Sequence, residues 1–278
     1  MSEANPKKSQ ELSRWLVALV LIPPTLAVIF LTNKLFLLAL TMVLGTLAWK
    51  EFSFNLLGRE RRGLFILALT GFYCTILGAS FFGADGQSAG LAASLILGGA
   101  YLMRVLAEEN DKVSVNLLSR YCLGQIYLSF FLSFIMLIKQ LDHGANWLFF
   151  IVLVTSLNDT AAFYVGSRLG GPKLYPKISP NKTISGFMGG CLVSFIVGGL
   201  SANFLPLQFN WFYLALLGLF LGVWGTFGDL FESSIKRAMG IKDTSNILKG
   251  HGGVWDRLDS LLFNLAPVYY FVNWLTQP

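Results

Sequence analysis

The sequence predicts an all-α integral membrane protein, a polytopic bundle of about nine transmembrane helices with two polar cytoplasmic loops. The chain is 54% hydrophobic and only 13% charged, with a mean hydropathy of +0.61, which is more apolar than an ordinary soluble domain. Apolar runs near the spanning length of about 20 residues recur along it. Because these runs lack period-two alternation, they favour helices over a closed barrel.

The first apolar run, residues 15–32, follows a polar segment that contains Lys7, Lys8 and Arg14. Pro23 and Pro24 predict a kink within it. A signal peptide is the alternative interpretation, but the run is long and no small-residue cleavage site follows it. We therefore expect a retained membrane anchor.

Eight further spans are predicted from the remaining apolar runs. They cover residues 35–52, 64–83, 89–107, 121–138, 147–166, 186–204, 211–235 and 259–275. Two connections, 167–185 and 236–258, are longer than the others and rich in Lys, Arg, Gly and Pro, and long polar loops are often functional. We expect residues 1–140 to form a scaffold of transmembrane helices and residues 141–278 to form the catalytic region.

The basic residues predict the orientation of the chain in the membrane. If the N-terminus is cytoplasmic, the loops on the opposite side keep only Lys34 and Lys139, and both long loops are cytoplasmic. Most basic residues then face the cytoplasm, where they contact anionic lipid headgroups. This placement accounts for the net charge of +6, so no nucleic-acid partner is needed.

Acidic residues collect where predicted spans meet the two long loops. Asp159 ends an apolar run, Asp229 and Glu232 lie near the end of the eighth span, and Asp256 and Asp259 open the ninth. A single acid of this kind is readily explained as a hydrated helix end, but five on one side favour a site. Their spacing supports this, since 256 and 259 are i and i+3, and positions 229, 232, 233 and 236 form one helical stripe.

Clustered carboxylates without partners repel one another and take up protons, and a hard divalent cation removes that cost. Oxygen ligands with few histidines indicate Mg²⁺ or Mn²⁺ rather than zinc. Basic residues surround the acids, although positive-inside anchoring accounts for part of them. Glycines in both loops allow backbone N–H groups to approach an anion. These features predict a metal-dependent enzyme that handles phosphates, without a P-loop motif.

The charged stretch also resembles a known signature. Ser233-Ser234-Ile235-Lys236-Arg237, then Lys242-Asp243, then His251-Gly252-Gly253-Val254-Trp255-Asp256-Arg257-Leu258-Asp259 is similar to that of the phosphatidate cytidylyltransferases, or CDP-diacylglycerol synthases. Residues 158–186 resemble the second conserved region of that family. Lys249 and Ser185 depart from the family pattern, which usually has Pro or Gly at the first position and an acid at the second.

This resemblance implies that CTP and phosphatidate react to give CDP-diacylglycerol and pyrophosphate, with the lipid phosphate as its own nucleophile. It implies Mg²⁺ (or Mn²⁺), with K⁺ as a second cation, a bacterial-type inner (plasma) membrane and a homodimer. The implied catalytic residues are Asp229, Lys236, Arg237, Lys242, Asp243, His251 and Arg257. The implied substrate-binding residues are Asp159, Ser179, Lys182, Ser233, Gly252 and Gly253, and the implied metal ligands are Asp229, Asp256 and Asp259.

Two other functions stay open at this point. A CTP-dependent polyprenol or phytol kinase has a similar nucleotide region but attacks the γ-phosphorus and releases CDP. An ion-coupled transporter also buries acids and breaks helices with glycine, but it predicts acids near the bilayer midplane in two related halves.

Overall fold

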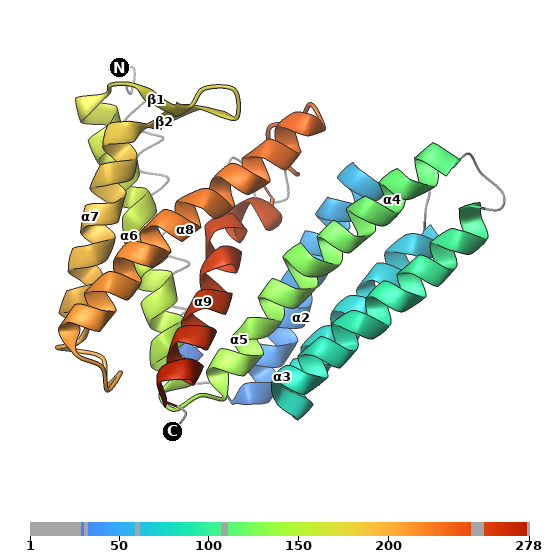
Figure 1. Ribbon diagram of the computed structural model, residues 1–278, viewed down its shortest axis with the longest axis horizontal. Coiled ribbons are helices and arrows are strands. Elements are labelled where there is room, and N and C mark those ends of the chain that lie inside the picture. The colour runs from blue at the N-terminus through green and yellow to red at the C-terminus, as the bar shows by residue number, and fades with distance from the viewer. Residues whose placement is uncertain (1–28, 31–32, 59–61, 107–110, 246–252, 277–278) are drawn as a thin grey trace, which may run out of the picture.

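The computed structural model describes residues 29–30, 33–58, 62–106, 111–245 and 253–276. Helices dominate these residues, which confirms the predicted all-α class (Figure 1). Their order is α2 (Lys34–Phe52), π-helix η1 (Ser53–Leu57), α3 (Arg62–Leu106), α4 (Asp111–Gly124), π-helix η2 (Gln125–Phe130), α5 (Phe131–Lys139), α6 (Gly144–Leu169), strands β1 (Lys173–Tyr175) and β2 (Ser179–Thr183), α7 (Ile184–Ser201), α8 (Trp211–Ala238), 3-10 helix η3 (Trp255–Arg257) and α9 (Asp259–Thr276).

Six helical stretches within the described residues are long and apolar enough to cross a membrane, as in a multi-pass membrane protein. They are Lys34–Leu57, Arg62–Arg104, Val115–Lys139, Gly144–Leu169, Ile184–Ser201 and Trp211–Ala238. The predicted count of nine is not confirmed. The expected span 15–32 lies almost wholly outside the described residues, α3 covers two expected spans, and α9 is not among the six.

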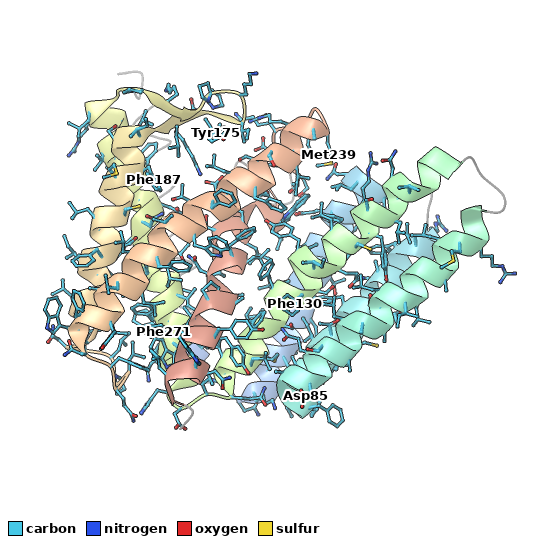
Figure 2. All side chains as sticks on the ribbon, in the orientation of Figure 1. Asp85, Phe130, Tyr175, Phe187, Met239 and Phe271 are labelled. Carbon is cyan, nitrogen blue, oxygen red and sulfur yellow. The ribbon has the colours of Figure 1, made fainter. Side chains whose placement is uncertain are left out.

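The two spans expected within α3 form a helical hairpin. Gly83 interrupts the helix with φ 67° and ψ −149°, a left-handed conformation that suits glycine. The chain reverses there, near Asp85, and the two halves of α3 then run side by side (Figures 1 and 2). They touch through glycine, because a methyl group added at Gly78 would lie 2.1 Å from the Gly86 carbonyl oxygen.

The helices form two groups, with α9 between them (Figure 1). Helices α2 to α5 form one group, and α6, α7 and α8 form the other together with the β1–β2 hairpin. Aromatic side chains connect the first group to the segment before α9: the Phe52 and Trp255 ring centroids are 5.2 Å apart, and those of Tyr127 and Trp255 are 6.2 Å apart. The N-terminal helices therefore pack directly against residues of the charged stretch.

Many large apolar side chains are exposed on the outer faces of the helices, as expected for groups that contact lipid. Examples are Phe82 in the α3 hairpin, Trp211 in α8 and Trp274 in α9, which are 76%, 58% and 83% exposed. Such exposure would be unfavourable in water, so it supports the membrane environment that the composition predicts.

Candidate functional site

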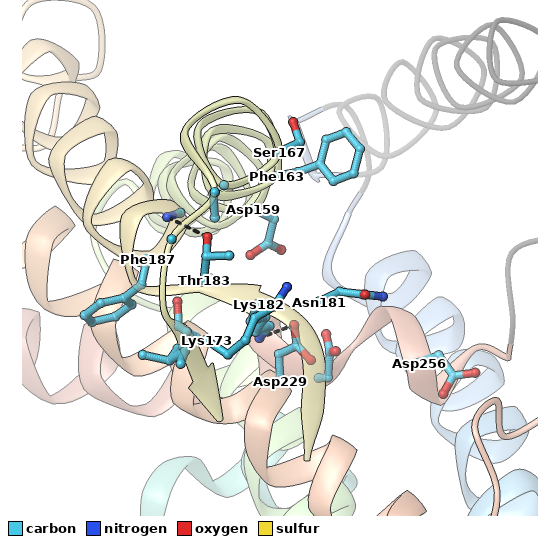
Figure 3. A pocket seen from close by; sticks show the side chains of 18 of the residues that line it. Asp159, Phe163, Ser167, Lys173, Asn181, Lys182, Thr183, Phe187, Asp229 and Asp256 are labelled. Atoms are coloured by element: carbon cyan, nitrogen blue, oxygen red, sulfur yellow. Dashed lines mark hydrogen bonds and ion pairs between the residues drawn. The ribbon is translucent and has the colours of Figure 1, made fainter. Parts of the chain in front are cut away.

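A pocket of about 830 Å³ lies between α6, the β1–β2 hairpin, α7, α8 and the start of α9 (Figure 3). Its charged lining residues come from the two long polar connections of the sequence and from the helices next to them. They are Asp159, Lys173, Lys182, Asp229, Asp256, Arg257 and Asp259. Four of the predicted catalytic and substrate-binding residues therefore line one cavity, and so do all three expected metal ligands, with Asp229 in both sets.

The β1–β2 hairpin brings a lysine to the acids of α8. The sequence predicted only a polar loop over 167–185, whereas the structure pairs Lys173 with Thr183 and Tyr175 with Ser179 in antiparallel register. The Thr183 hydroxyl accepts a hydrogen bond from the Gly186 N–H and so caps α7. The preceding residue, Lys182, places its Nζ 2.5 Å from Asp229 Oδ2.

Three carboxylates form the centre of the site. One oxygen from each of Asp229, Glu232 and Asp259 lies within 4.8 Å of the other two, so these residues could hold a metal ion. Asp229 and Glu232 share one face of α8, as the i, i+3 spacing predicts. Asp159 approaches from α6, and its carboxylate points toward Lys182 and Asp229 (Figure 3). Oxygen donors of this type fit a hard divalent cation such as Mg²⁺.

Asp256 has a different environment from the other acids. Its Oδ1 accepts a hydrogen bond from Lys236 Nζ at 3.0 Å, and its Oδ2 accepts from the backbone N–H groups of Thr244 and Gly253 at 3.0 and 2.7 Å. Burial raises the pKa of Asp256, but hydrogen bonds led by the one from Gly253 outweigh it and hold that pKa below its usual value. The carboxylate therefore keeps its negative charge beside Lys236.

Asp256 and Asp259 do not share the helix that their spacing suggested. Asp256 lies in the 3-10 turn η3, and Asp259 is the first residue of α9. Asp256 lies apart from Asp159 and Asp229 in the site (Figure 3). The structure brings the expected ligands Asp229 and Asp259 together with Glu232, while metal binding by Asp256 stays a prediction.

Lys236 connects two of the acids. Its Nζ lies 2.8 Å from Glu232 Oε2 and 3.0 Å from Asp256 Oδ1, and its side chain is 11% exposed. The lysine is thus largely buried in an ion-pair network that joins α8 to η3. In this arrangement its single positive charge is shared between two carboxylates.

The other predicted residues are spread around the pocket. Arg237 donates to the carbonyl oxygens of Ile178 and Ile241 and so joins α8 to the hairpin, while the Ser233 hydroxyl donates to Asp229 at 3.3 Å. Ser179 begins β2, and Lys242 and Asp243 are exposed beyond the end of α8. His251 and Gly252, like Lys249, lie outside the described residues.

Gly253 was expected to leave its N–H open to an anion, but that N–H donates to Asp256. A methyl group added at Gly253 would lie 2.3 Å from Thr244 Oγ1 and 2.4 Å from Glu51 Oε2. Close packing therefore also requires a glycine at this position. This contact identifies Glu51, an acid of the N-terminal helices that the sequence analysis did not select.

Comparison with known proteins places the chain among nucleotide-transferring proteins. Residues 12–275 match the model of the cytidylyltransferase family. The chain is 37% identical over 198 residues to a phosphatidate cytidylyltransferase of Bacillus subtilis (strain 168), covering 69% of this chain and 71% of the relative. It is also similar to phosphatidate cytidylyltransferases of Staphylococcus epidermidis (strain RP62A), at 42% over 134 residues, and Staphylococcus haemolyticus, at 44% over 122 residues. These matches cover 48% and 44% of this chain and 52% and 47% of the two staphylococcal relatives.

Proposed function

Since the chain belongs to the cytidylyltransferase family, we propose that it is a phosphatidate cytidylyltransferase. It joins CTP and phosphatidate to give CDP-diacylglycerol and pyrophosphate. The observation that carries this proposal is the pocket in which Asp229 and Asp259 meet Lys182, with Glu232 buried beside these two acids, next to long apolar helices. A polyphosphate nucleotide needs positive charge, which the lysine and a cation held by the acids would supply. A diacyl lipid needs access from the membrane, which the apolar helices provide.

The reaction requires little covalent chemistry from the protein. Phosphatidate is a phosphate monoester whose second pKa is about 6, so at pH 7 it is mostly dianionic and nucleophilic. One of its oxygens forms a bond to the α-phosphorus of CTP, the bond from that phosphorus to the bridging oxygen breaks, and pyrophosphate leaves with the electron pair. The protein must align the two phosphates and balance the charge that grows on pyrophosphate.

Charged residues in and beside the pocket are suited to these two tasks. Asp229, Glu232 and Asp259 would hold Mg²⁺ (or Mn²⁺), which supplies positive charge beside the reacting phosphates. K⁺ as a second cation, and Asp256 as a further ligand, belong to the same proposal through the resemblance. Lys182 and Arg257 line the pocket and are suited to neutralise the triphosphate.

The positions of the basic residues support an orientation in the membrane. The hairpin and the C-terminal end of α8 lie at the same end of the molecule (Figure 1). The hairpin carries Lys173, Lys177 and Lys182, and the end of α8 carries Lys236 and Arg237. We therefore propose that this end and the N-terminus face the cytoplasm, in a bacterial plasma membrane. CTP then reaches the pocket from the cytoplasm, while phosphatidate enters from the inner leaflet. A homodimer is part of the proposal through the resemblance alone.

Lys182→Met is expected to lower kcat/KM for CTP by about 10- to 100-fold, the usual effect of losing a charge-assisted hydrogen bond. Initial rates at varied CTP concentration would measure this change. Lys177→Met is the matched control, because Lys177 is an exposed lysine in the turn of the same hairpin and does not line the pocket. Equal rates for the two variants would contradict a role for Lys182 in nucleotide binding.

Labelled CTP distinguishes the proposed transfer from a lipid kinase reaction. The purified protein would be incubated with phosphatidate and CTP that carries ³²P at the α- or the γ-position. Cytidylyl transfer places the α-label in the lipid product and leaves the γ-label in pyrophosphate. Appearance of the γ-label in lipid, with release of CDP from a reaction that contains an isoprenoid alcohol, would replace the proposal with the kinase.

A further inference from the structure

Glu51 is a buried acid near the C-terminal end of α2, far in sequence from the residues of the pocket. It is only 3% exposed, yet its carboxylate accepts four hydrogen bonds. Oε1 accepts from the Ser245 hydroxyl at 2.6 Å and the Val254 N–H at 3.0 Å. Oε2 accepts from the Thr244 hydroxyl at 3.2 Å and the Trp255 N–H at 2.9 Å. All four donors lie within residues 233–259, the stretch that contains the signature residues and is called the signature region below.

These bonds connect two segments of the chain that also meet at Asp256. Thr244 donates its hydroxyl to Glu51 and its backbone N–H to Asp256 Oδ2. Gly253, which precedes the two N–H donors to Glu51, likewise donates its N–H to Asp256. Segments 244–245 and 253–255 are therefore held between two carboxylates, one from α2 and one from η3.

Further contacts from α2 support the same segments. Asn55, one turn after Glu51, donates its side-chain amide to the Thr244 carbonyl oxygen at 3.0 Å. The Phe52 ring packs against Trp255, which is fully buried. Gly253 leaves no room for a side chain between Thr244 and Glu51. The C-terminal end of α2 thus contacts the signature region both through hydrogen bonds and through close packing.

We infer that Glu51 is a positioning residue for the transfer reaction. By holding segments 244–245 and 253–255, it fixes η3 and the start of α9, and so places Asp259 against Asp229 and Glu232 of α8. The N-terminal helices, expected to be a scaffold, thereby set the geometry of the active site. This inference rests on the proposed function and adds to it a residue of the N-terminal half.

Glu51→Gln tests the inference with almost no change in shape. A glutamine side chain has one acceptor oxygen and one NH₂ group, so either orientation turns the NH₂ toward the N–H of Val254 or Trp255. We expect kcat to fall by about 10- to 100-fold, as when other groups that orient metal ligands are lost. The KM for CTP should change little, since Glu51 does not line the pocket. Hydrogen exchange of the peptide that covers residues 253–258 should rise.

Thr41→Val is the matched control on the same helix. Thr41 is 3% exposed, and its hydroxyl donates to the Leu37 carbonyl oxygen of its own turn. Neither kcat nor exchange at 253–258 should change in this variant. Thr244→Val removes one of the four donors to Glu51 and keeps the carboxylate. We expect a smaller fall in kcat and a smaller rise in exchange than in Glu51→Gln. This second variant keeps the inference testable if Glu51→Gln does not fold.

The outcomes separate positioning from a purely structural role. Wild-type kcat in the folded fraction of Glu51→Gln, or loss of activity with unchanged exchange at 253–258, would overturn the inference. If the wild-type protein releases no pyrophosphate, the proposed function fails, whereas the exchange measurement still decides whether Glu51 holds the signature region. Higher exchange in Glu51→Gln but not in Thr41→Val supports that part of the inference.

Discussion

Asp259→Asn is expected to lower turnover by about 10²- to 10³-fold, the usual loss when one element of electrostatic stabilisation is removed from an active site. The substitution preserves the shape of the side chain but removes one of three carboxylates that lie within 4.8 Å of one another. Because these charges repel when no cation is bound, the variant should melt at the same or a higher temperature than the wild type in EDTA. It should also lose most of the stabilisation that Mg²⁺ gives to the wild type.

Thermal unfolding with and without Mg²⁺, together with initial rates, would measure both effects. Asp85→Asn is the control, because Asp85 is an exposed acid at the end of the α3 hairpin. Near wild-type turnover in Asp259→Asn would contradict a metal-binding role for this residue. A lower melting temperature in EDTA would show that Asp259 stabilises the fold instead.

Asp256→Asn is expected to lower the free energy of unfolding by about 3 kcal/mol, near the lower end for a broken buried ion pair. The Lys236 and Asp256 side chains are only 11% and 8% exposed, but Lys236 keeps Glu232 as a partner. An asparagine NH₂ would also face either Lys236 or the N–H groups of Thr244 and Gly253. Denaturation in detergent would measure the loss, again with Asp85→Asn as control.

The pH dependence of this loss tests its physical origin. The pKa of Asp256 is lowered in the folded protein, so its ionised form stabilises the fold above the unfolded pKa of about 3.9. That contribution disappears as the pH falls through the folded-state value. The difference in stability between wild type and Asp256→Asn should therefore shrink below about pH 4. A constant difference at all pH values would assign the loss to packing.

The sequence predicted the membrane class and most of the helices, because long apolar runs leave few alternatives in lipid. It also predicted the stripe of Asp229 and Glu232, since i, i+3 spacing on a helix fixes a shared face. The runs 64–83 and 89–107 correspond to the two halves of α3, which meet at Gly83. These predictions depend only on local geometry.

Non-local contacts account for the rest. Glu51 is bonded to residues about two hundred positions away, and its only local signal is an acid at the end of an apolar run. The β1–β2 hairpin has few residues, so it gives no clear alternation of apolar and polar positions. The i, i+3 spacing of Asp256 and Asp259 predicted one shared helix face. Asp256 lies instead in the 3-10 turn Trp255–Arg257, so the two acids have different neighbours. Such features depend on which segments meet in the fold.

The most direct test of the central claim is pyrophosphate release by the detergent-purified protein with CTP, Mg²⁺ and phosphatidate, each omitted in turn. We expect release only when all three are present, with CDP-diacylglycerol formed in equal amount. Release without phosphatidate, or a folded protein that is inactive with the complete mixture, would contradict the assignment.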